Sequence, residues 1–434
     1  MAWHVVIAGG GFGGFYAART LERVLPAQSA RVTLVSEVNF LLFTPLLPGA
    51  AAGTLEPRHV VVPLREQLTR TDLALGRVVG AEPERSELIV DSLDGRRERL
   101  RYDHLVVALG SISRTQPVPG LVEHALGFKT LADAIALRNR VIELLEVAET
   151  VPDAASRAAY LTLVFVGAGY AGLEGLAELQ DFMGDVIELY PRCRVQGMRW
   201  VLVEARERVM IEVASSLAAF AQRELRGRGV DIRTGTTVTR IEQDAVELSD
   251  GERIAARTVV WTAGVRPHPV VGALGLPLDR GGRVEVDRTM RVKGHQNVWA
   301  IGDAAAVPDP ARKGQVCPPT AQHAIRQGRR VARNVTAELG AGGRVRPFAY
   351  RSLGVFVDMG RHQAVASTVG IRWRGFPAWF LARSYHMANM PGAKRKLRLI
   401  VDWTVSLLFS RDTSELGQLG HPPALEHDRS PGEA

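Results

Sequence analysis

Cysteine is scarce in this chain of 434 residues, which has only two, Cys193 and Cys317. Two cysteines cannot build a disulfide framework, a cysteine-rich zinc site or a cysteine-ligated iron–sulfur cluster. We therefore predict no metal centre. The low cysteine content is typical of a protein from a reducing compartment.

Long apolar runs are also missing. No stretch of about 20 apolar residues occurs, so we expect no membrane-spanning helix. The apolar residues 40–53 are interrupted by Pro45 and Pro48. A glycine-rich motif begins at residue 9, so we expect no cleavable signal peptide.

Acidic residues are fewer than basic ones, 46 against 54, which gives a formal net charge of +8. A basic chain can bind nucleic acid, the phosphates of a flavin or nicotinamide dinucleotide, or an anionic membrane. The charge is mostly dispersed along the sequence, and no nucleic-acid-binding motif is present, so we predict no nucleic-acid partner. Apolar residues make up 46% of the chain, as in ordinary folded proteins, and the length predicts two or three domains.

A dinucleotide-binding fingerprint opens the sequence. A short apolar strand pattern at residues 5–7 leads into Gly9-x-Gly11-x-x-Gly14, then a helical stretch and a second apolar run that ends at Glu37. Strand, glycine turn, helix, strand and terminal acid in this order are the sequence context in which the fingerprint binds a dinucleotide.

The same pattern occurs a second time. An apolar run at residues 161–166 precedes Gly167-x-Gly169-x-x-Gly172, and the next strand ends at Glu204. Each copy is followed by an Asp-Gly turn suited to a hairpin, 81 residues after Gly14 and 79 residues after Gly172, and then by an apolar strand that ends in glycine. We interpret the chain as two copies of one nucleotide-binding unit. A pair of glycine turns without ligands is the alternative.

The chemistry of both fingerprints suits dinucleotides. Glycines let the backbone approach a pyrophosphate, the helix N-terminus offers free N–H groups, and Glu37 and Glu204 can each accept hydrogen bonds from a ribose. At the second site a carboxylate repels a 2′-phosphate and favours NADH over NADPH, although Arg206 or Arg208 could pair with that phosphate. Two dinucleotide sites in one chain suggest that a flavin stays bound and takes hydride from a nicotinamide dinucleotide that binds and dissociates.

Several stretches together resemble the flavoproteins with two dinucleotide-binding domains, and among these the type II NADH dehydrogenases. They are GGGFGG at 9–14, FTPLLP at 43–48, LGFKTLADAIALRNRV at 126–141, GAGYAGLE at 167–174, WAIGDAA at 299–305 and PPTAQHAIRQG at 318–328. The resemblance implies an α/β fold with two Rossmann-like, glutathione-reductase-like domains and a C-terminal membrane-associating region. It implies FAD at residues 1–125 and 276–345, NADH at 126–275, and a strand and amphipathic-helix region at 346–420.

The resemblance also implies site residues. Those for FAD are Gly9, Gly11, Phe12, Gly13, Gly14, Glu37, Thr44, Pro45, Ala108, Gly110, Lys129, Gly302 and Asp303. Those for NADH are Gly167, Gly169, Gly172, Glu204 and Gly264. Glu174, Gln322 and His323 are the implied catalytic residues, with Gln322 and His323 near the quinone at the start of a helix that begins near Pro319. The alternatives are a charge at a helix N-terminus for Glu174, a helix-face histidine for His323 and a helix N-cap for Asp303.

The missing cysteines separate this chain from its relatives in the superfamily. Disulfide reductases carry a Cys-x4-Cys pair shortly after the first acid, and residues 39–48 contain no cysteine. Sulfide:quinone oxidoreductases need at least two redox cysteines, whereas here only Cys317, just before PPTAQHA, could lie near the flavin, and Cys193 lies in the second domain. We therefore interpret Cys193 and Cys317 as structural.

The C-terminal region changes character after about residue 345. Residues 371–402 hold seven Lys or Arg but only one acid, Asp402, and apolar residues recur at helical spacing from Leu397 to Leu408. A basic flank beside an apolar face suits a helix at a membrane interface, and a dimer interface or an ordinary packed helix is the alternative. Residues 421–434 are predicted to be a disordered tail.

The sequence thus predicts a non-proton-pumping, FAD-dependent NADH:quinone oxidoreductase. We expect a peripheral homodimer on the cytoplasmic face of the cell membrane, with menaquinone or ubiquinone as acceptor. An NADH-dependent reductase of a soluble redox protein, or a flavoprotein whose NADH binding controls association or signalling, is the alternative.

Overall fold

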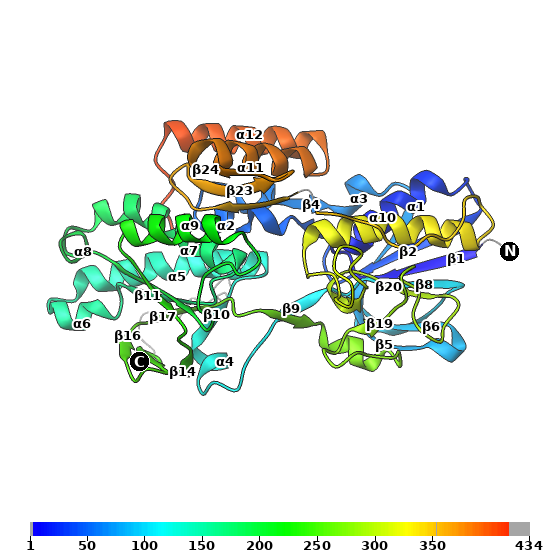
Figure 1. Ribbon diagram of the computed structural model, residues 1–434, viewed down its shortest axis with the longest axis horizontal. Helices are drawn as coiled ribbons and strands as arrows, with labels where there is room; N and C mark the ends of the chain where they lie inside the picture. Colours follow the sequence, from blue (N-terminus) through cyan, green and yellow to red (C-terminus); the bar gives the residue numbers. More distant parts are fainter. Residues whose placement is uncertain (1–2, 353, 416–434) are drawn as a thin grey trace, which may run out of the picture.

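The computed structural model describes residues 3–352 and 354–415. Two α/β units lie side by side, and a C-terminal layer of strands and helices covers both (Figure 1). Within the described residues, no helix combines the length and apolar character needed to cross a membrane. The tail predicted at 421–434 lies outside the described residues.

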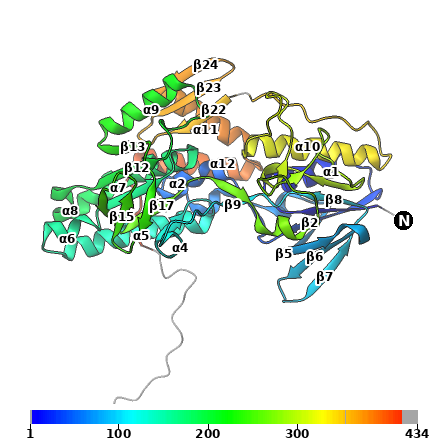
Figure 2. The same ribbon diagram turned by 60° about the horizontal axis from the view of Figure 1, so that its bottom comes forward.

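The first unit is built on a seven-stranded sheet. The first five strands in spatial order are parallel: β20 (Val298–Ala300), β8 (His104–Val107), β1 (Trp3–Ala8), β2 (Ala30–Ser36) and β5 (Thr71–Glu82). Beyond β5, the sheet continues with two antiparallel strands, β6 (Glu87–Ser92) and β7 (Arg97–Arg101). Helices α1 (Phe12–Val24) and α10 (Ala321–Glu338) lie side by side over one face, and Figure 2 shows the β5-β6-β7 part on the opposite side.

The second unit repeats this arrangement. Its parallel sheet has the order β10 (Ala125–Gly127), β17 (Thr258–Trp261), β11 (Thr162–Val166), β12 (Arg199–Glu204) and β13 (Val230–Thr234). The helices of this unit are α4 (Leu121–His124), α5 (Leu131–Thr150), α6 (Ala154–Ala158), α7 (Tyr170–Val186), α8 (Pro191–Gln196) and α9 (Ser215–Gly227). A separate antiparallel sheet holds β14 (Val238–Ile241), β15 (Ala245–Leu248) and β16 (Arg253–Ala255).

The topology confirms the predicted duplication. In each unit the fingerprint follows a central strand, and the next two parallel strands of the chain lie in order to one side of it. After an antiparallel excursion, the chain returns to the other side of the central strand, as β8 in the first unit and β17 in the second. The predicted Asp-Gly turns at Gly95 and Gly251 lie in those excursions, between β6 and β7 and between β15 and β16.

Two antiparallel strands join the units. β9 (Ser111–Ser113) carries the chain out of the first unit, and β18 (Val265–Pro267) carries it back. β10 begins one residue before the predicted boundary at 125/126 and already belongs to the second sheet. Short elements complete the first unit: β3 (Phe40–Leu42), β4 (Val61–Pro63), α3 (Leu64–Gln67), β19 (Val284–Glu285) and β21 (Ala305–Ala306). Helix α2 (Leu47–Ala51) instead packs against α5 and α7, and Leu47 and Ala51 are buried in the core of the second unit.

The C-terminal region is an antiparallel sheet followed by a helical hairpin. Its elements are β22 (Gly354–Asp358), β23 (Ala364–Thr368), β24 (Ile371–Arg374), α11 (Gly375–Asn389) and α12 (Ala393–Leu408). Val357 and Met359 are buried in the core of the second unit, whereas Met390 and Leu399 are buried in the core of the first. The region therefore fastens the two units together.

The basic flank predicted for residues 371–402 is only partly correct. Arg395 is buried and donates to the carbonyl oxygen of Arg58, at 2.7 Å. Arg383 lies over the rings of Trp379 and Trp403. These two cations face inward because their long side chains pack against the helices and loops beneath them, so the outer surface is less basic than predicted.

Candidate functional site

One cavity of about 900 Å³ lies where both fingerprint loops, α10 and α11 meet. Sixteen of the predicted site residues line it: Gly9, Gly11, Phe12, Gly13, Glu37, Thr44, Pro45, Ala108, Gly110, Lys129, Gly169, Glu174, Gly264, Gly302, Asp303 and Gln322. Gly14, Gly167, Gly172, Glu204 and His323 do not line it. The fold therefore gathers most of the predicted residues around one space.

The first fingerprint forms a cradle for a phosphate group. Gly9 has φ +113°, and a Cβ there would lie 2.4 Å from the carbonyl oxygen of Ala108. A Cβ on Gly14 would lie 1.8 Å from the carbonyl oxygen of Gly9, so α1 can start here only with glycine. A Cβ on Gly11 would meet no atom within 4 Å and would instead fill the cavity at the N-terminus of α1. This bare, electropositive helix end fits the pyrophosphate of FAD.

The second fingerprint has the same construction. Gly167 has φ +102°, and a Cβ on Gly172 would lie 1.9 Å from the carbonyl oxygen of Gly167. A Cβ on Gly169 would meet no atom within 4 Å, as at Gly11. A second phosphate cradle therefore opens at the N-terminus of α7.

Glu204 ends β12 beside this cradle. Its carboxylate accepts the backbone N–H of Ala168 at 2.7 Å and that of Arg206 at 3.0 Å. The guanidinium of Arg208 donates to the loop carbonyls of Met210, Ile211 and Val213. Arg208 thus braces its own loop, and of the two candidate arginines only Arg206 presents an exposed side chain next to Glu204.

A hydrogen-bonded chain links the two units across the cavity. Lys129 donates through Nζ to the hydroxyl of Ser111 at 2.8 Å, and Ser111 donates to Asp303 at 2.6 Å. Burial lowers the pKa of Lys129, and the charge of Asp303 opposes that shift. Ser111 was not predicted from the sequence, because a serine in a short strand carries no recognisable pattern.

The first turn of α10 forms another wall. Thr320 caps the helix and accepts the backbone N–H of His323. Gln322 faces the cavity; its amide accepts from the Tyr350 hydroxyl at 2.7 Å and donates to the carbonyl oxygen of Gly354 at 3.2 Å. His323 points away: its Nδ1 lies 2.7 Å from the Thr320 hydroxyl, and its ring packs edge-on against Tyr350. The structure therefore places Gln322 in the cavity and His323 in support of the helix start.

An aromatic wall closes the cavity on the side of the C-terminal region. Phe356 of β22 stacks on Tyr385 of α11, with ring centroids 4.8 Å apart, and His386 contacts Phe356 and Phe43 edge-on. Burial lowers the pKa of His386 to about 4, so the imidazole is neutral at pH 7. These residues were not predicted as site residues, since no motif marks them in the sequence.

Glu174 lies in the second turn of α7, beyond the first turn in which a charge acts on the helix N-terminus. Its carboxylate accepts the backbone N–H of Asp358 at 2.9 Å, so β22 covers it. Burial raises the pKa of Glu174 well above its ordinary value, and the neighbouring charges of Asp358 and Glu178 act in the same direction. Burial therefore favours the protonated form of Glu174, and its position past the first turn of α7 does not suit a charge at the helix end.

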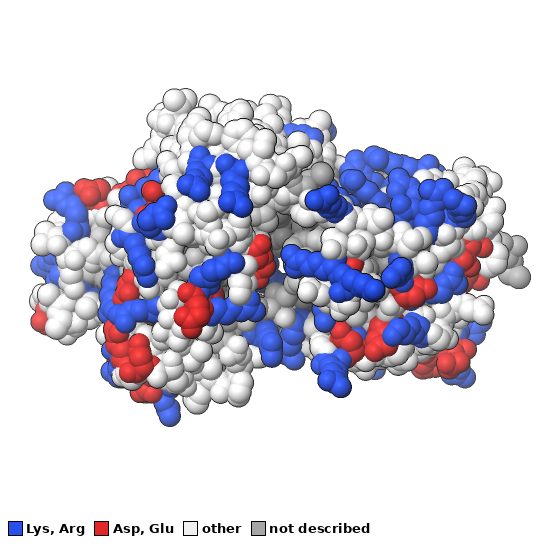
Figure 3. Space-filling view, viewed as in Figure 1, with Lys and Arg blue, Asp and Glu red and all other residues white. Residues whose placement is uncertain are grey.

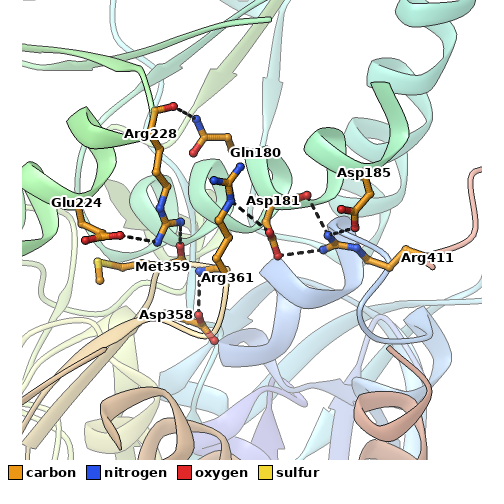
Figure 4. Close-up of polar contacts among 10 residues, drawn as sticks. Gln180, Asp181, Asp185, Glu224, Arg228, Asp358, Met359, Arg361 and Arg411 are labelled. Carbon is orange, nitrogen blue, oxygen red and sulfur yellow. Dashed lines mark hydrogen bonds and ion pairs between the residues drawn. The ribbon is translucent and has the colours of Figure 1, made fainter. Parts of the chain in front are cut away.

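A small second cavity behind Glu174 is lined by Glu178, Asp358, Arg383 and His386. Burial raises the pKa of both Glu178 and Asp358. Figure 4 shows how the turn after β22 is held beside α7: Asp358 accepts the N–H of Gly360, and Arg228 donates to the carbonyl oxygen of Met359.

Two further arginines strengthen this attachment. Arg361 lies 3.5 Å from Asp181 of α7, and Arg411 contacts both Asp181 and Asp185 (Figure 4). The segment after α12 is thereby anchored to the same helix that carries Glu174.

Neither cysteine lines the main cavity. Cys193 is buried in α8, and its thiol lies 3.9 Å from the carbonyl oxygen of Leu145. The Cys317 thiol lies 3.8 Å from the carbonyl oxygen of Pro308. Burial raises the pKa of both thiols to about 12, which keeps them protonated and unreactive.

Comparison with known proteins gives a consistent result. The family described as pyridine nucleotide-disulphide oxidoreductase matches residues 3–328. A probable NADH dehydrogenase of Dictyostelium discoideum is 30% identical over 94% of this chain and 90% of its own length. The type II NADH:quinone oxidoreductase Ndh of Mycobacterium tuberculosis is 31% identical over 94% of this chain and 88% of its own.

Among solved structures, NDH2 of Plasmodium falciparum in complex with NADH superposes with a TM-score of 0.87 at 18% identity, covering 95% of this chain and all (100%) of that one. At this low identity, the likeness shows the fold.

Proposed function

The chain belongs to the pyridine nucleotide-disulphide oxidoreductase family and, within it, to the type II NADH dehydrogenases, and on this premise we propose how its cavity serves an FAD-dependent NADH:quinone oxidoreductase. One observation carries the proposal, the shared cavity. Both fingerprints, an aromatic wall and the half-buried Glu174 border it, and no cysteine lines it. Bound FAD supplies the two-electron carrier between NADH and quinone.

The first unit, residues 1–125 and 276–345, would hold FAD. The N–H groups at the start of α1 bind the pyrophosphate, and Glu37 accepts from the ribose. Asp303, fixed by Ser111 and Lys129, accepts hydroxyls of the linking chain. Thr44 and Pro45 border the ring, and the first turn of α10 presents its positive end there.

The second unit, residues 126–275, would bind NADH. The cradle at Gly169 holds the pyrophosphate, and Glu204 accepts from the adenosine ribose and disfavours a 2′-phosphate. Tyr170, Glu174 and Gly264 line the shared cavity, so a nicotinamide bound in this unit reaches the space that the flavin ring occupies.

The quinone would enter beside the aromatic wall. Phe356 and Tyr385 offer apolar ring faces, and Gln322 offers an amide donor to a quinone oxygen. Reducing a quinone consumes two protons, of which NADH brings one as hydride. Glu174 is a half-buried acid that lines this cavity, and we assign it the supply of the other proton.

Membrane association would follow from the outer surface of the helical hairpin. We name as the apolar ridge its exposed apolar side chains: Phe376, Phe380, Leu397, Ile400, Val401, Val405, Leu407 and Leu408. Exposed fractions of 59% at Phe380 and 71% at Leu408 are large for such residues and favour a lipid-facing role. The quinone entrance lies on the inner side of the same hairpin, which suits an acceptor dissolved in the membrane. We propose a peripheral enzyme on the cytoplasmic face. A homodimer formed through part of this ridge is the other assembly that it could support.

Anaerobic stopped-flow absorbance tests the proposal. NADH should bleach the flavin band rapidly, and a water-soluble quinone added next should restore it rapidly. Bleaching without recovery by any quinone would overturn the quinone reductase assignment and would favour a different acceptor. Absence of bleaching by NADH would overturn the assigned hydride donor.

A further inference from the structure

The outer surface of the first unit carries an unusual concentration of arginine. A Cβ on Gly328 would lie 2.3 Å from the carbonyl oxygen of Gly13, so glycine here allows α10 to pack closely on α1. At 3.6 residues per turn, the buried residues Ala324, Val331 and Val335 lie on one side of α10 and its arginines on the other. We name as the arginine face the outward side chains of the two helices: Arg19, Arg23, Arg326, Arg329, Arg330 and Arg333.

No acid neutralises this face. Among the described residues, none of the six arginines lies within ion-pair distance of a carboxylate, whereas arginines elsewhere are paired, such as Arg97 with Asp91 at 2.8 Å. The acids of the two helices are engaged elsewhere. Glu22 accepts from the backbone N–H of Arg70 and the hydroxyl of Thr71, and Glu338 pairs with Arg291. The face therefore keeps its full positive charge.

The arginine face adjoins the helical hairpin of the C-terminal region. The hydroxyl of Tyr16 in α1 lies 3.4 Å from the carbonyl oxygen of Asn389, the last residue of α11. The guanidinium of Arg329 lies over the Tyr16 ring, 4.9 Å from its centroid. Figure 3 shows the dense basic area over α1 and α10 beside the largely uncharged surface of α11 and α12.

We propose that the arginine face binds the anionic headgroups of phospholipids, so that the first unit lies on the membrane together with the helical hairpin. The inference rests on the membrane association proposed above. Guanidinium groups suit phosphate oxygens, and cations near an anionic bilayer strengthen its binding. We favour a membrane over a soluble polyanion because the face adjoins the helical hairpin that carries the apolar ridge, and a nucleic acid could not use that ridge.

The test measures binding of the FAD-loaded protein to vesicles by co-sedimentation. The vesicles are phosphatidylcholine with or without phosphatidylglycerol. The variant Arg329→Gln/Arg333→Gln removes two exposed charges and should bind the anionic vesicles about thirtyfold more weakly, at about 1 kcal/mol per cation. Arg329→Lys/Arg333→Lys keeps the charge and should stay close to wild type. Arg280→Gln/Lys313→Gln removes equal charge from loops outside both helices and should also stay close to wild type. Flavin absorbance and reduction of a soluble dye confirm that each variant is folded.

The outcomes separate this inference from the proposed function. Equal losses in the arginine-face variant and the loop variant would overturn it, because net charge alone would explain them. The inference would also be overturned if the arginine-face variant bound vesicles as tightly as wild type while Phe380→Ser lost binding. Membrane contact would then be restricted to the apolar ridge. An equally tight, salt-sensitive complex of the face with a DNA duplex would overturn the lipid assignment. Reduction of a water-soluble quinone without vesicles tests the enzyme assignment independently of all these results.

Discussion

Replacing Glu174 with glutamine tests the proton supply most directly. The glutamine amide oxygen can still accept the N–H of Asp358 that Glu174 accepts at 2.9 Å, so the local structure should persist. The exchangeable proton is lost. Burial raises the pKa of Glu174 well above its ordinary value, which favours the protonated carboxyl group, and this group is isosteric with glutamine.

The size of the effect follows from the other groups on the cavity. General acids contribute roughly 10²–10⁴-fold to a rate. His386 is neutral because burial lowers its pKa to about 4, and burial raises the pKa of Tyr170, so neither is a good acid at pH 7. Lys129 and water can reach the same cavity, however, and so we take the lower end of the range. We expect quinone turnover to fall about a hundredfold, which is about 2.7 kcal/mol in activation free energy.

The assay compares two acceptors in one preparation. Ferricyanide takes electrons without protons, so NADH:ferricyanide turnover should stay near wild type while NADH:quinone turnover falls. Wild-type quinone turnover should also decline as the pH rises through the raised pKa of Glu174, because the acid must be protonated, and the variant should lack this decline. Glu123→Gln, at an exposed glutamate of α4, is the matched control. Parallel losses with both acceptors would refute the reasoning and would place Glu174 in hydride transfer or folding.

Three other substitutions test separate parts of the structure. Gly172→Ala places a Cβ 1.9 Å from a backbone oxygen and should abolish tight binding of NADH, which a titration measures. Gly227→Ala is the control: the space around Gly227 is open, so NADH binding should be unchanged. Glu204→Arg should shift the kcat/KM preference toward NADPH, and unchanged selectivity would remove the role assigned to Glu204. Glu178→Gln should make the free energy of unfolding, measured in urea, less dependent on pH. Burial raises the pKa of Glu178 above its ordinary value of 4.5, so its contribution to the stability of the folded state is greatest below pH 4.5. As the pH rises from there toward the raised pKa, the free energy of unfolding falls by about 1.4 kcal/mol per pH unit. An unchanged slope in the variant would contradict this account.

The two nucleotide-binding units could be predicted from the sequence because their signal is local. Positive φ at Gly9 and Gly167, together with the backbone contacts that exclude a Cβ at Gly14 and Gly172, requires glycine at fixed spacing. The strand order then repeats because the same unit occurs twice.

The choice between neighbouring helix residues was beyond the sequence. Gln322 and His323 are one residue apart, which is about 100° around a helix. Only the docking of α10 on α1 decides that Gln322 faces the cavity and His323 the capping residue Thr320. The role of His386 was equally hidden, because its partners Phe43 and Phe356 come from distant parts of the chain.

The charge pattern was misleading for the same reason. Along the sequence the basic residues seem dispersed, since α1 and α10 are separated by some 300 residues. Packing the two helices together joins their arginines into one face. Conversely, Arg383 and Arg395 look like part of a basic flank in sequence but turn inward in the fold.

The two copies of the nucleotide-binding unit differ chiefly in what covers their first helix. In the first unit α10 covers α1 and supplies Gln327, whose side-chain oxygen accepts the N–H of Gly302 beside the FAD cradle. In the second unit β22 covers α7 and places the N–H of Asp358 on Glu174. The same β22 and α11 supply the aromatic wall through Phe356 and Tyr385. On the proposed function, the acceptor therefore contacts elements that were added to a duplicated scaffold. Substitutions in β22 and α11 should therefore change the acceptor without altering NADH binding, and substitutions in the fingerprints should do the reverse.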